Sequence, residues 1–269
     1  MAEGSPMPIV AGLCFLLAAV AYAREWRGGA WLGAAGIVIL AGALAARNLR
    51  AGHWPLTGEY EFALAFALST ALVGLTLALN PKRHAPALMA GTMMAAALLA
   101  AYARFGLPAH KRAILPLPPF LDTLWFPLHV STAALADGAL AMGGIAGLVW
   151  LLRQVFPGNH TEGADGTQIE QHLDRAIATG FPLLTLSMIF GMIWAQVAWG
   201  RYWGWDLKEL WTLIAWLIYA LYWHVRRRPH WQGRRLAWLA LLGLGAILVT
   251  FLGVGWLARA SGVESLHLF

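Results

Sequence analysis

Long apolar runs that contain no Asp, Glu, Lys or Arg dominate the pattern along the chain. These runs cover residues 4–23, 28–46, 62–81, 85–103, 123–136, 138–152, 176–200, 210–225 and 236–258. A helix of about 20 apolar residues crosses the roughly 30 Å hydrocarbon core of a bilayer. Only Asp137 separates the fifth run from the sixth, so we join these two into one helix. The pattern predicts an all-α polytopic membrane protein with about eight transmembrane helices.

The composition agrees with a single integral membrane domain over residues 1–269. Hydrophobic residues make up 59% of the chain and charged residues only 12%, about half the charged fraction of a typical soluble protein. No basic residue precedes the first run, which favours a true span over a cleaved signal peptide. The formal charge of +6 is therefore no nucleic-acid signature, because in a membrane protein the excess of Lys and Arg mostly sets orientation. We therefore expect a lipid bilayer as surroundings and no nucleic acid as partner.

Positive charge predicts the orientation. Residues 226–235, RRRPHWQGRR, hold five arginines, which places this loop in the cytoplasm. Alternation through eight spans puts the loop at 153–175 on the same side, and within it the polar, glycine-containing stretch 157–172 reads as a flexible connector. Both termini and the tryptophan-rich segment at about 196–211 then lie on the extracytoplasmic side.

Residues 199–211, WGRYWGWDLKELW, mix aromatic and charged side chains. One interpretation is an aromatic belt, because Trp collects at the headgroup level of a bilayer. The other interpretation is an amphipathic re-entrant element, in which helical spacing puts Trp199 and Trp203 on one face and Asp206 and Glu209 on another. Such an element would suit a flat, mostly apolar ligand that carries charged substituents. The composition leaves both interpretations open.

Three of the nine histidines occupy positions that indicate chemistry. His129 lies near the extracytoplasmic end of its predicted helix, and His267 follows the last span on the same side. Two neutral imidazoles can supply both axial positions of a haem iron, although a single histidine near a helix end is more often structural. His224 ends the seventh span, either as an interfacial residue or as a ligand nearer the inner leaflet. Asp137 has a polar partner inside its span or belongs to a polar path.

The stretch WGRYWGWDLKELWTLIAWLIYALYWH at 199–224 resembles the WWD motif of haem-handling membrane proteins. These are the CcsA/ResC family of system II cytochrome c biogenesis and the related CcmC. The chain departs from the family pattern at Leu207 and Leu210, where Pro and Thr are usual. Further segments resemble the family at 52–66, 117–130, 180–200 and 265–269, so the resemblance runs from about residue 47 onward.

The resemblance implies a haem-binding subunit of a cytochrome c synthetase. Such a subunit carries haem b, non-covalently and in transit, and presents it on the extracytoplasmic face of the bacterial inner membrane. The residues implied to take part are His129, His267, His224, Trp199, Trp203, Trp205, Asp206, Trp211, Arg201 and Lys208.

Each of these residues has an implied role. His129 and His267 would be the axial ligands of the haem iron, and the four tryptophans would form the surface against the macrocycle. Lys208 or Arg201 would meet the propionates. Asp206 and Glu209 would order the loop by pairing with these cations, and His224 would act in haem entry from the inner side.

The chemistry implied by the resemblance needs no nucleophile from this chain. The CxxCH thiols of an apocytochrome c add across the haem vinyl groups, so catalysis is mainly positioning, and we predict no catalytic residue here. The expected partners are a CcsB/ResB-type membrane protein and the apocytochrome, and whether this chain alone is an enzyme stays open. The alternatives are a CcmC-like protein that hands haem to a chaperone, a HemX-like regulatory protein, a scaffold without haem and a transporter.

Overall fold

The computed structural model describes residues 5–26, 28–54, 56–78, 85–156, 164–255 and 257. Every predicted apolar segment forms an α-helix there, and the described residues contain no strand. The long helices are α1 (Met7–Ala23), α2 (Gly29–Ala51), α3 (Glu59–Ala78), α4 (Pro86–Ala101), α6 (Trp125–Val155), α7 (Ala164–Trp199), α8 (Leu207–Val225) and α9 (Arg234–Leu248). The short elements are α5 (Ala109–Arg112), η2 (Tyr102–Gly106), η3 (Pro119–Leu121), η4 (Pro229–Trp231) and η5 (Val249–Gly253).

The helices are those of an integral membrane protein. Among the described residues, five segments are long and apolar enough to cross a bilayer, namely Gly29–Ala51, Pro86–Gly106, Trp125–Val155, Gly166–Trp199 and Arg234–Gly253. Met7–Ala23 is a shorter apolar helix. Helix α6 continues through Asp137, which confirms that the two runs around this residue form one helix. The total of eight spans stays a prediction.

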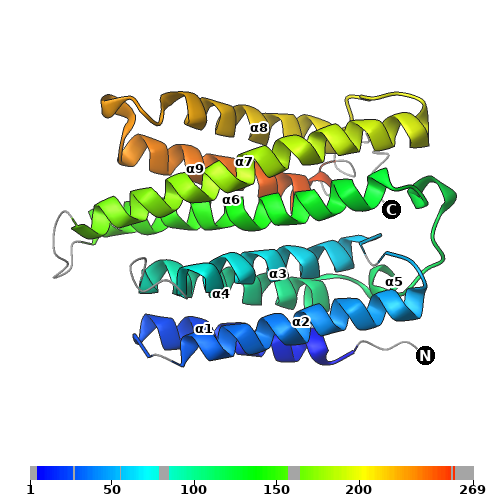
Figure 1. The fold of residues 1–269 in the computed structure, drawn as a ribbon, viewed down its shortest axis with the longest axis horizontal. Helices are drawn as coiled ribbons and strands as arrows, with labels where there is room; N and C mark the ends of the chain where they lie inside the picture. Colours follow the sequence, from blue (N-terminus) through cyan, green and yellow to red (C-terminus); the bar gives the residue numbers. More distant parts are fainter. Residues whose placement is uncertain are drawn as a thin grey trace.

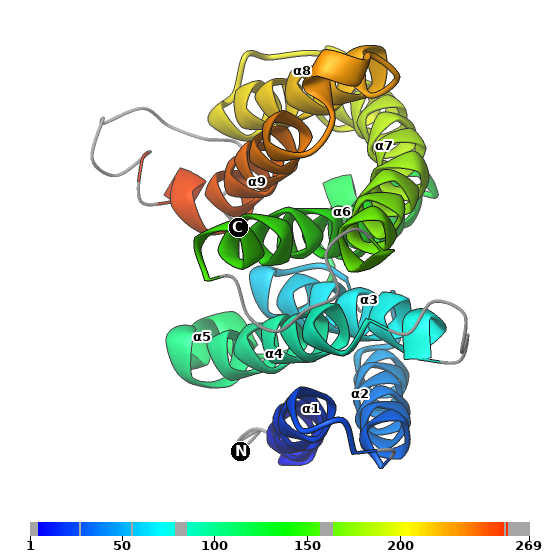
Figure 2. The same ribbon diagram turned by 90° about the vertical axis from the view of Figure 1, so that its left-hand side faces the viewer.

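The helices form two layers (Figure 1). One layer holds α1 to α5 and the other holds α6 to α9, and the end-on view in Figure 2 shows α3 and α4 facing α6. Small residues let α3 and α6 approach each other closely, as is common between helices in membranes. A Cβ atom at Gly138 of α6 would lie 2.5 Å from the Cβ atom of Ser69 and 2.8 Å from the backbone nitrogen of Thr70 on α3.

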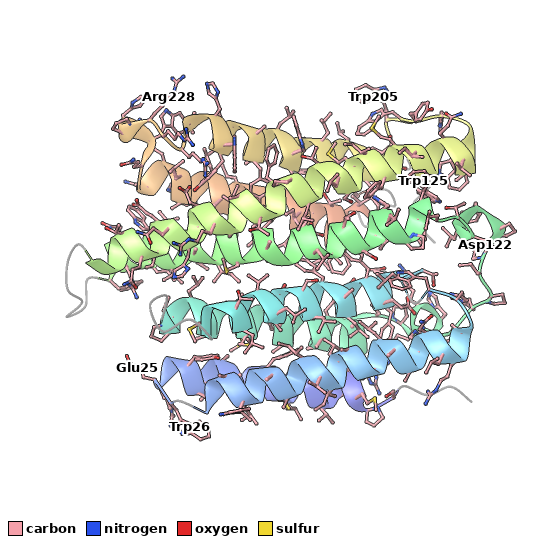
Figure 3. All side chains as sticks on the ribbon, viewed as in Figure 1. Glu25, Trp26, Asp122, Trp125, Trp205 and Arg228 are labelled. Carbon is pink, nitrogen blue, oxygen red and sulfur yellow. The ribbon has the colours of Figure 1, made fainter. Side chains whose placement is uncertain are left out.

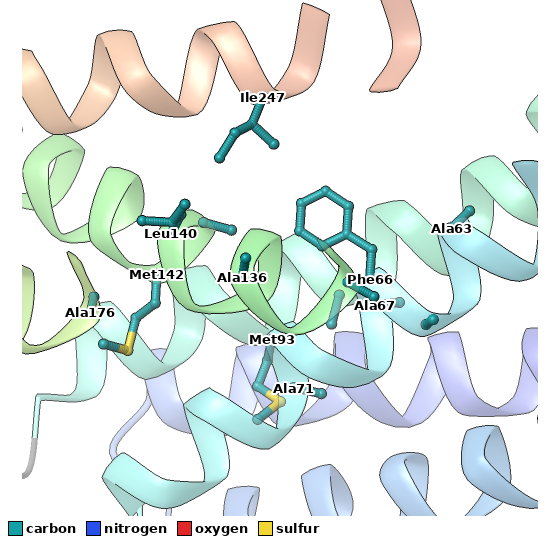
Figure 4. Close-up of a cluster of buried hydrophobic side chains, with 14 of the residues drawn as sticks. Ala63, Phe66, Ala67, Ala71, Met93, Ala136, Leu140, Met142, Ala176 and Ile247 are labelled. Atoms are coloured by element: carbon teal, nitrogen blue, oxygen red, sulfur yellow. The ribbon is translucent and has the colours of Figure 1, made fainter. Parts of the chain in front are cut away.

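The buried core runs between the two layers. Figure 4 shows Phe66 of α3 and Leu140 of α6 in this core, with Ile247 of α9 above them. Alanines fill the remaining contacts, among them Ala63, Ala67, Ala71, Ala136 and Ala176. Because these side chains are small, the helix backbones can approach each other closely in this core.

The two ends of the molecule carry different loops (Figure 3). Glu25, Trp26 and Arg228 lie at one end, which we call the Arg228 end. Trp205, Asp122 and Trp125 lie at the other end, which we call the Trp205 end. The alternation predicted from the sequence also puts 24–27 with 226–235 and the tryptophan-rich segment opposite them. The assignment of the Trp205 end to the extracytoplasmic side stays a prediction.

The prediction of a loop over 153–175 is wrong for most of its length. Helix α6 continues to Val155, and α7 begins at Ala164. Ile169 and Leu173 are buried, and His172 between them is only 2% exposed. Apolar residues four positions apart give this part of α7 a buried face despite its polar composition. The loop at 226–235 is confirmed, apart from the turn η4 and the start of α9 at Arg234.

Candidate functional site

A cavity of about 530 Å³ lies between the two layers toward the Trp205 end. Its walls come from α3, η2 and α5 of one layer and from α6, α7, α8 and η5 of the other. The volume falls within the range of roughly 300–1,000 Å³ that is usual for small-molecule and cofactor sites. Most of the lining is apolar, and a few polar groups converge on it, which is the pattern of a ligand site.

The imidazole of His129 lines this cavity one turn into α6. Its Nδ1 atom lies 2.8 Å from the carbonyl oxygen of Ser187 on α7. A carbonyl can only accept a hydrogen bond, so Nδ1 carries the proton, and in the neutral ring Nε2 carries the lone pair. A Cβ atom at Gly191 would lie 2.8 Å from Nδ1, so the glycine allows α7 to approach the ring. The ring is thus held in the tautomer in which Nε2 can bind a metal.

The indole of Trp194 supports the histidine. The two rings are nearly parallel, with 6° between their planes and 6.2 Å between their centroids. Trp194 is 1% exposed and donates a hydrogen bond of 2.9 Å from Nε1 to the carbonyl oxygen of Phe120. Trp199 packs edge-on against Trp194 and also contacts the Phe120 ring. This aromatic group fixes the plane of the imidazole on the side that faces η3.

A polar cluster lines the same cavity. The Glu59 carboxylate accepts hydrogen bonds from the Tyr102 hydroxyl and from Lys111 Nζ, the latter over 2.6 Å. Lys208, in the first turn of α8, also lines the cavity and interacts electrostatically with Glu59. These four residues belong to α3, η2, α5 and α8, so the folded chain alone brings them together.

Two groups of this cluster, the Glu59 carboxyl and the Lys208 ammonium, have shifted pKa values. Glu59 precedes the apolar segment at 62–81, and Lys208 precedes the apolar segment at 210–225. Burial alone would raise the pKa of the Glu59 carboxyl, but the hydrogen bonds from Lys111 and Tyr102 lower it below its usual value. Burial lowers the pKa of the Lys208 ammonium, although Glu59 and Asp206 act in the opposite direction. A further carboxylate next to Lys208 would stabilise its charged form.

Residues 200–206 do not have the helical spacing that one of the two interpretations of the segment 199–211 assumed. Trp199 ends α7, residues 200–206 are irregular, and α8 begins at Leu207. The backbone is left-handed at Gly200, with φ of 72°, and at Trp205, with φ of 58°, which breaks helical spacing. Trp203 packs edge-on against Trp205, with 5.9 Å between ring centroids.

The two carboxylates of this segment order it by capping α8. The Asp206 carboxylate accepts a hydrogen bond of 2.8 Å from the backbone nitrogen of Lys208. The Glu209 carboxylate accepts hydrogen bonds from the backbone nitrogens of Gly204 and Asp206, over 2.8 and 3.1 Å. This reciprocal arrangement is a capping box. Both carboxylates therefore order the loop through backbone amides. The expected pairing with Arg201 and Lys208 stays a prediction.

Three of the predicted site residues come together around the cavity. His129, Trp203 and Lys208 line it, together with Glu209. The other residues predicted for the extracytoplasmic site lie near the cavity but outside its lining, namely Trp199, Trp205, Trp211, Asp206 and Arg201. Trp205 is 72% exposed at the surface of the loop. The four tryptophans therefore do not form one continuous platform in this structure.

The predicted site residue His224 lies away from the cavity. His224 is sixteen residues after Lys208 on α8, about 24 Å along the helix axis. It is exposed near the Arg228 end, where its Nε2 atom lies 3.2 Å from an Nη atom of Arg228. It does not line the cavity. His267 lies outside the described residues, so its role stays a prediction.

Sequence reasoning missed several lining residues. Glu59 and Lys111 are 52 positions apart, and the signal available for Glu59 was a charged residue immediately before a long apolar run. Ser187 and Trp194 belong to a continuous apolar run, where nothing distinguishes them from lipid-facing residues. Asp137, which we had noted, is buried and lines the cavity.

Leu207→Pro is expected to leave the fold unchanged. Leu207 is the first residue of α8, a position where Pro is favourable, and the preceding Asp206 already has extended backbone with ψ of 153°. The free energy of unfolding, measured by thermal denaturation, should change by less than about 0.5 kcal/mol. The matched control is Leu210→Pro, which deletes the 2.9 Å bond from Leu210 N to Asp206 O and should cost about 3 kcal/mol. Equal destabilisation by both changes would contradict the assigned start of α8.

Comparison with known proteins assigns the chain to a family. Residues 57–260 match the family described as Cytochrome C assembly protein. The chain belongs to this family. The matched residues run from the start of α3 through η5 and include every residue that lines the cavity except Leu56. Helices α1 and α2 precede the matched region.

Individual relatives agree with the family assignment. The chain is 34% identical over 279 residues to the cytochrome c biogenesis protein CcsA of Synechococcus elongatus, and the aligned region covers 85% of each chain. It is 34% identical over 249 residues to CcsA of a second Synechococcus strain, with 82% of this chain and 79% of the relative covered. It is 30% identical over 314 residues to CcsA of Crocosphaera subtropica, with 91% and 93% covered. The resemblance seen in the WWD segment therefore extends over most of the chain.

Proposed function

We propose that this membrane protein binds haem in the cavity at the Trp205 end and presents it for attachment to apocytochrome c. A role in cytochrome c biogenesis follows from the family and its CcsA relatives. The observation that carries the finer proposal is His129. Its Nδ1 proton is committed to the Ser187 carbonyl, which makes Nε2 the metal-binding nitrogen, and the ring borders a cavity of about 530 Å³.

The residues around the cavity suit haem chemically. Apolar side chains and the Trp203 ring would pack on the macrocycle, and Lys208 and Lys111 are cations in reach of propionate groups. His129 would be one axial ligand, held in orientation by Ser187 and Trp194. We propose His267 as the second axial ligand.

The chain's residues would act by holding the substrate in position. The apocytochrome supplies the two thiols, and haem supplies the vinyl groups to which they add. The rigid aromatic group behind His129 would keep the macrocycle in one plane while the thiols approach. The exposed rim at Trp205 and Tyr202 would lie at the side from which the apocytochrome arrives.

We further propose the cellular setting of this site. The Trp205 end would face the extracytoplasmic side of the bacterial inner membrane, because the arginine-rich loop at the Arg228 end favours the cytoplasm. A CcsB/ResB-type membrane protein would act with this chain, and haem b would be the cargo. His224 lies near the opposite end, beside Arg228. It would act in haem entry from the inner side, before haem reaches the cavity.

The test is covalent attachment in a host that lacks its own cytochrome c maturation proteins. The chain is co-expressed with a CcsB/ResB-type partner and an apocytochrome c, and haem that stays on the cytochrome through denaturing electrophoresis is measured. The proposal predicts attachment to CxxCH and none to an SxxSH variant of the apocytochrome. Haem that accumulates on this chain without any covalent product would instead favour a CcmC-like delivery protein.

A further inference from the structure

Glu59 occupies a distinctive place among the acids near the cavity. Its carboxylate bonds to two side chains, the Tyr102 hydroxyl and the Lys111 ammonium, whose nitrogen is 2.6 Å away. The side chains of Lys111 and Glu59 are 35% and 22% exposed to solvent, so the ion pair borders open space. In contrast, the bonds described for the Glu209 carboxylate go to two backbone nitrogens that fix the start of α8. An ion pair between flexible side chains can exchange partners more easily than a capping bond can.

A second ammonium group, from the other layer, lines the same cavity as this carboxylate. Lys208 of α8 is attracted by Glu59 and repelled by Lys111, and Glu59 is in turn stabilised by both lysines. All three residues line the cavity. One carboxylate thus bonds to the ammonium of Lys111 and is attracted by that of Lys208 across the same cavity, and Asp206 adds a further attraction for Lys208.

The cluster lies in the same cavity as the candidate iron ligand. His129 and Glu59 are both lining residues, on α6 and α3 respectively, with the apolar wall formed by Phe62 and Phe126. A ligand that fills this space and binds Nε2 of His129 would reach the lysines with whatever groups its edge carries. For haem, those edge groups include two carboxylates.

We propose that the Glu59 carboxylate occupies, in the absence of haem, the position of a substrate carboxylate. When haem binds, a carboxylate of haem displaces Glu59 from Lys111 and Lys208. The exchange replaces one ion pair with another of the same kind, so no proton or electron has to move. The two lysines make the cavity selective for a macrocycle with free carboxylates over the same macrocycle with neutral esters, and Glu59 reduces this preference because it competes for the lysines. This inference rests on the proposed haem site and assigns its specificity to residues outside the tryptophan-rich segment.

Two kinds of variant have opposite expected effects. Glu59→Gln removes the competing charge and keeps an acceptor for Tyr102 and Lys111, so haem affinity should increase by about threefold to tenfold. Lys111→Met keeps the length of the side chain and removes the cation, so haem affinity should decrease by about tenfold. Lys208→Met repeats the second test from the other layer, so that misfolding of one variant leaves the other to decide. The control is Arg50→Met, which removes an exposed cation that does not line the cavity.

The experiment is an absorbance titration of the purified full-length protein with haem and, separately, with haem dimethyl ester. Wild type should prefer haem by about tenfold or more. The preference should increase in Glu59→Gln, decrease to near unity in either lysine variant, and stay unchanged in Arg50→Met. Because the ester lacks the carboxylates, its own affinity should be nearly the same in all folded variants.

The outcomes separate this inference from the proposed function. Equal affinity of wild type for haem and for the ester would overturn the inference and leave the haem site standing. Weaker haem binding in Glu59→Gln would also overturn it, because the carboxylate would then support the site and not compete for it. Absence of binding to either compound would overturn the proposed haem site itself.

Discussion

His129→Ala is expected to remove most of the haem that the wild-type protein carries after purification. The change deletes the nitrogen that we propose as an iron ligand and also the ring that stacks on Trp194. Loss of His129 would leave the macrocycle held by packing, by propionate contacts and by the one remaining axial ligand that we propose, His267. The measurement is the ratio of Soret to protein absorbance, which should decrease at least about tenfold.

The control for this variant is His53→Ala. His53 is another histidine at the Trp205 end of the chain, bonded to backbone carbonyls of Trp54 and Leu115, and it does not line the cavity. It should retain wild-type absorbance. Imidazole added to His129→Ala should restore a low-spin spectrum, which a merely structural histidine would not do. A His129→Ala protein with an unchanged spectrum would rule out this residue as a ligand.

Gly138→Val is expected to separate the two layers and to abolish haem binding with them. Even a Cβ atom at Gly138 would lie 2.5 Å from Ser69 Cβ and 2.7 Å from its backbone carbonyl carbon, and a backbone cannot rotate away as a side chain can. Overpacking of this kind costs roughly 1–3 kcal/mol or more. Because the neighbouring Asp137 lines the cavity, a shift of α6 against α3 also changes the cavity itself.

The matched control is Gly42→Val in α2, where nothing lies within 4 Å of the added atom. Both changes place a β-branched residue within a helix, so they share the same cost in helix propensity. The melting temperature in detergent and the Soret absorbance should both decrease in Gly138→Val, and both should remain near the wild-type values in Gly42→Val. Similar behaviour of the two variants would contradict the close contact between α3 and α6.

The sequence predicts the helices well because each long apolar run has one stable solution in a bilayer. Satisfaction of every backbone amide within the segment requires a helix wherever the run is buried in lipid. The start of α7 escaped prediction because residues 164–175 are polar, and their few apolar positions gain meaning only from the buried face that they form. Composition describes a segment's average, whereas burial depends on which positions face a neighbour.

The site was predictable only in part. The family resemblance pointed to His129 in the segment 117–130 and to Trp203 and Lys208 in the WWD segment, and these three residues do line one cavity. It could not give the irregular backbone at 200–206, which depends on left-handed Gly200 and on the capping box at Asp206. Contacts such as Glu59 to Lys111 join segments that no local pattern relates, so they emerge only from the packed layers.

The central claim is that this chain alone holds haem through His129, and one absorption spectrum tests it most directly. Wild-type protein is purified in detergent after expression with haem supplied, and its spectrum is recorded before and after dithionite. The account predicts a Soret band and the sharp reduced bands of low-spin, bis-histidine haem. A colourless wild-type protein with an intact fold would contradict the account and would favour an aromatic belt in place of a haem site.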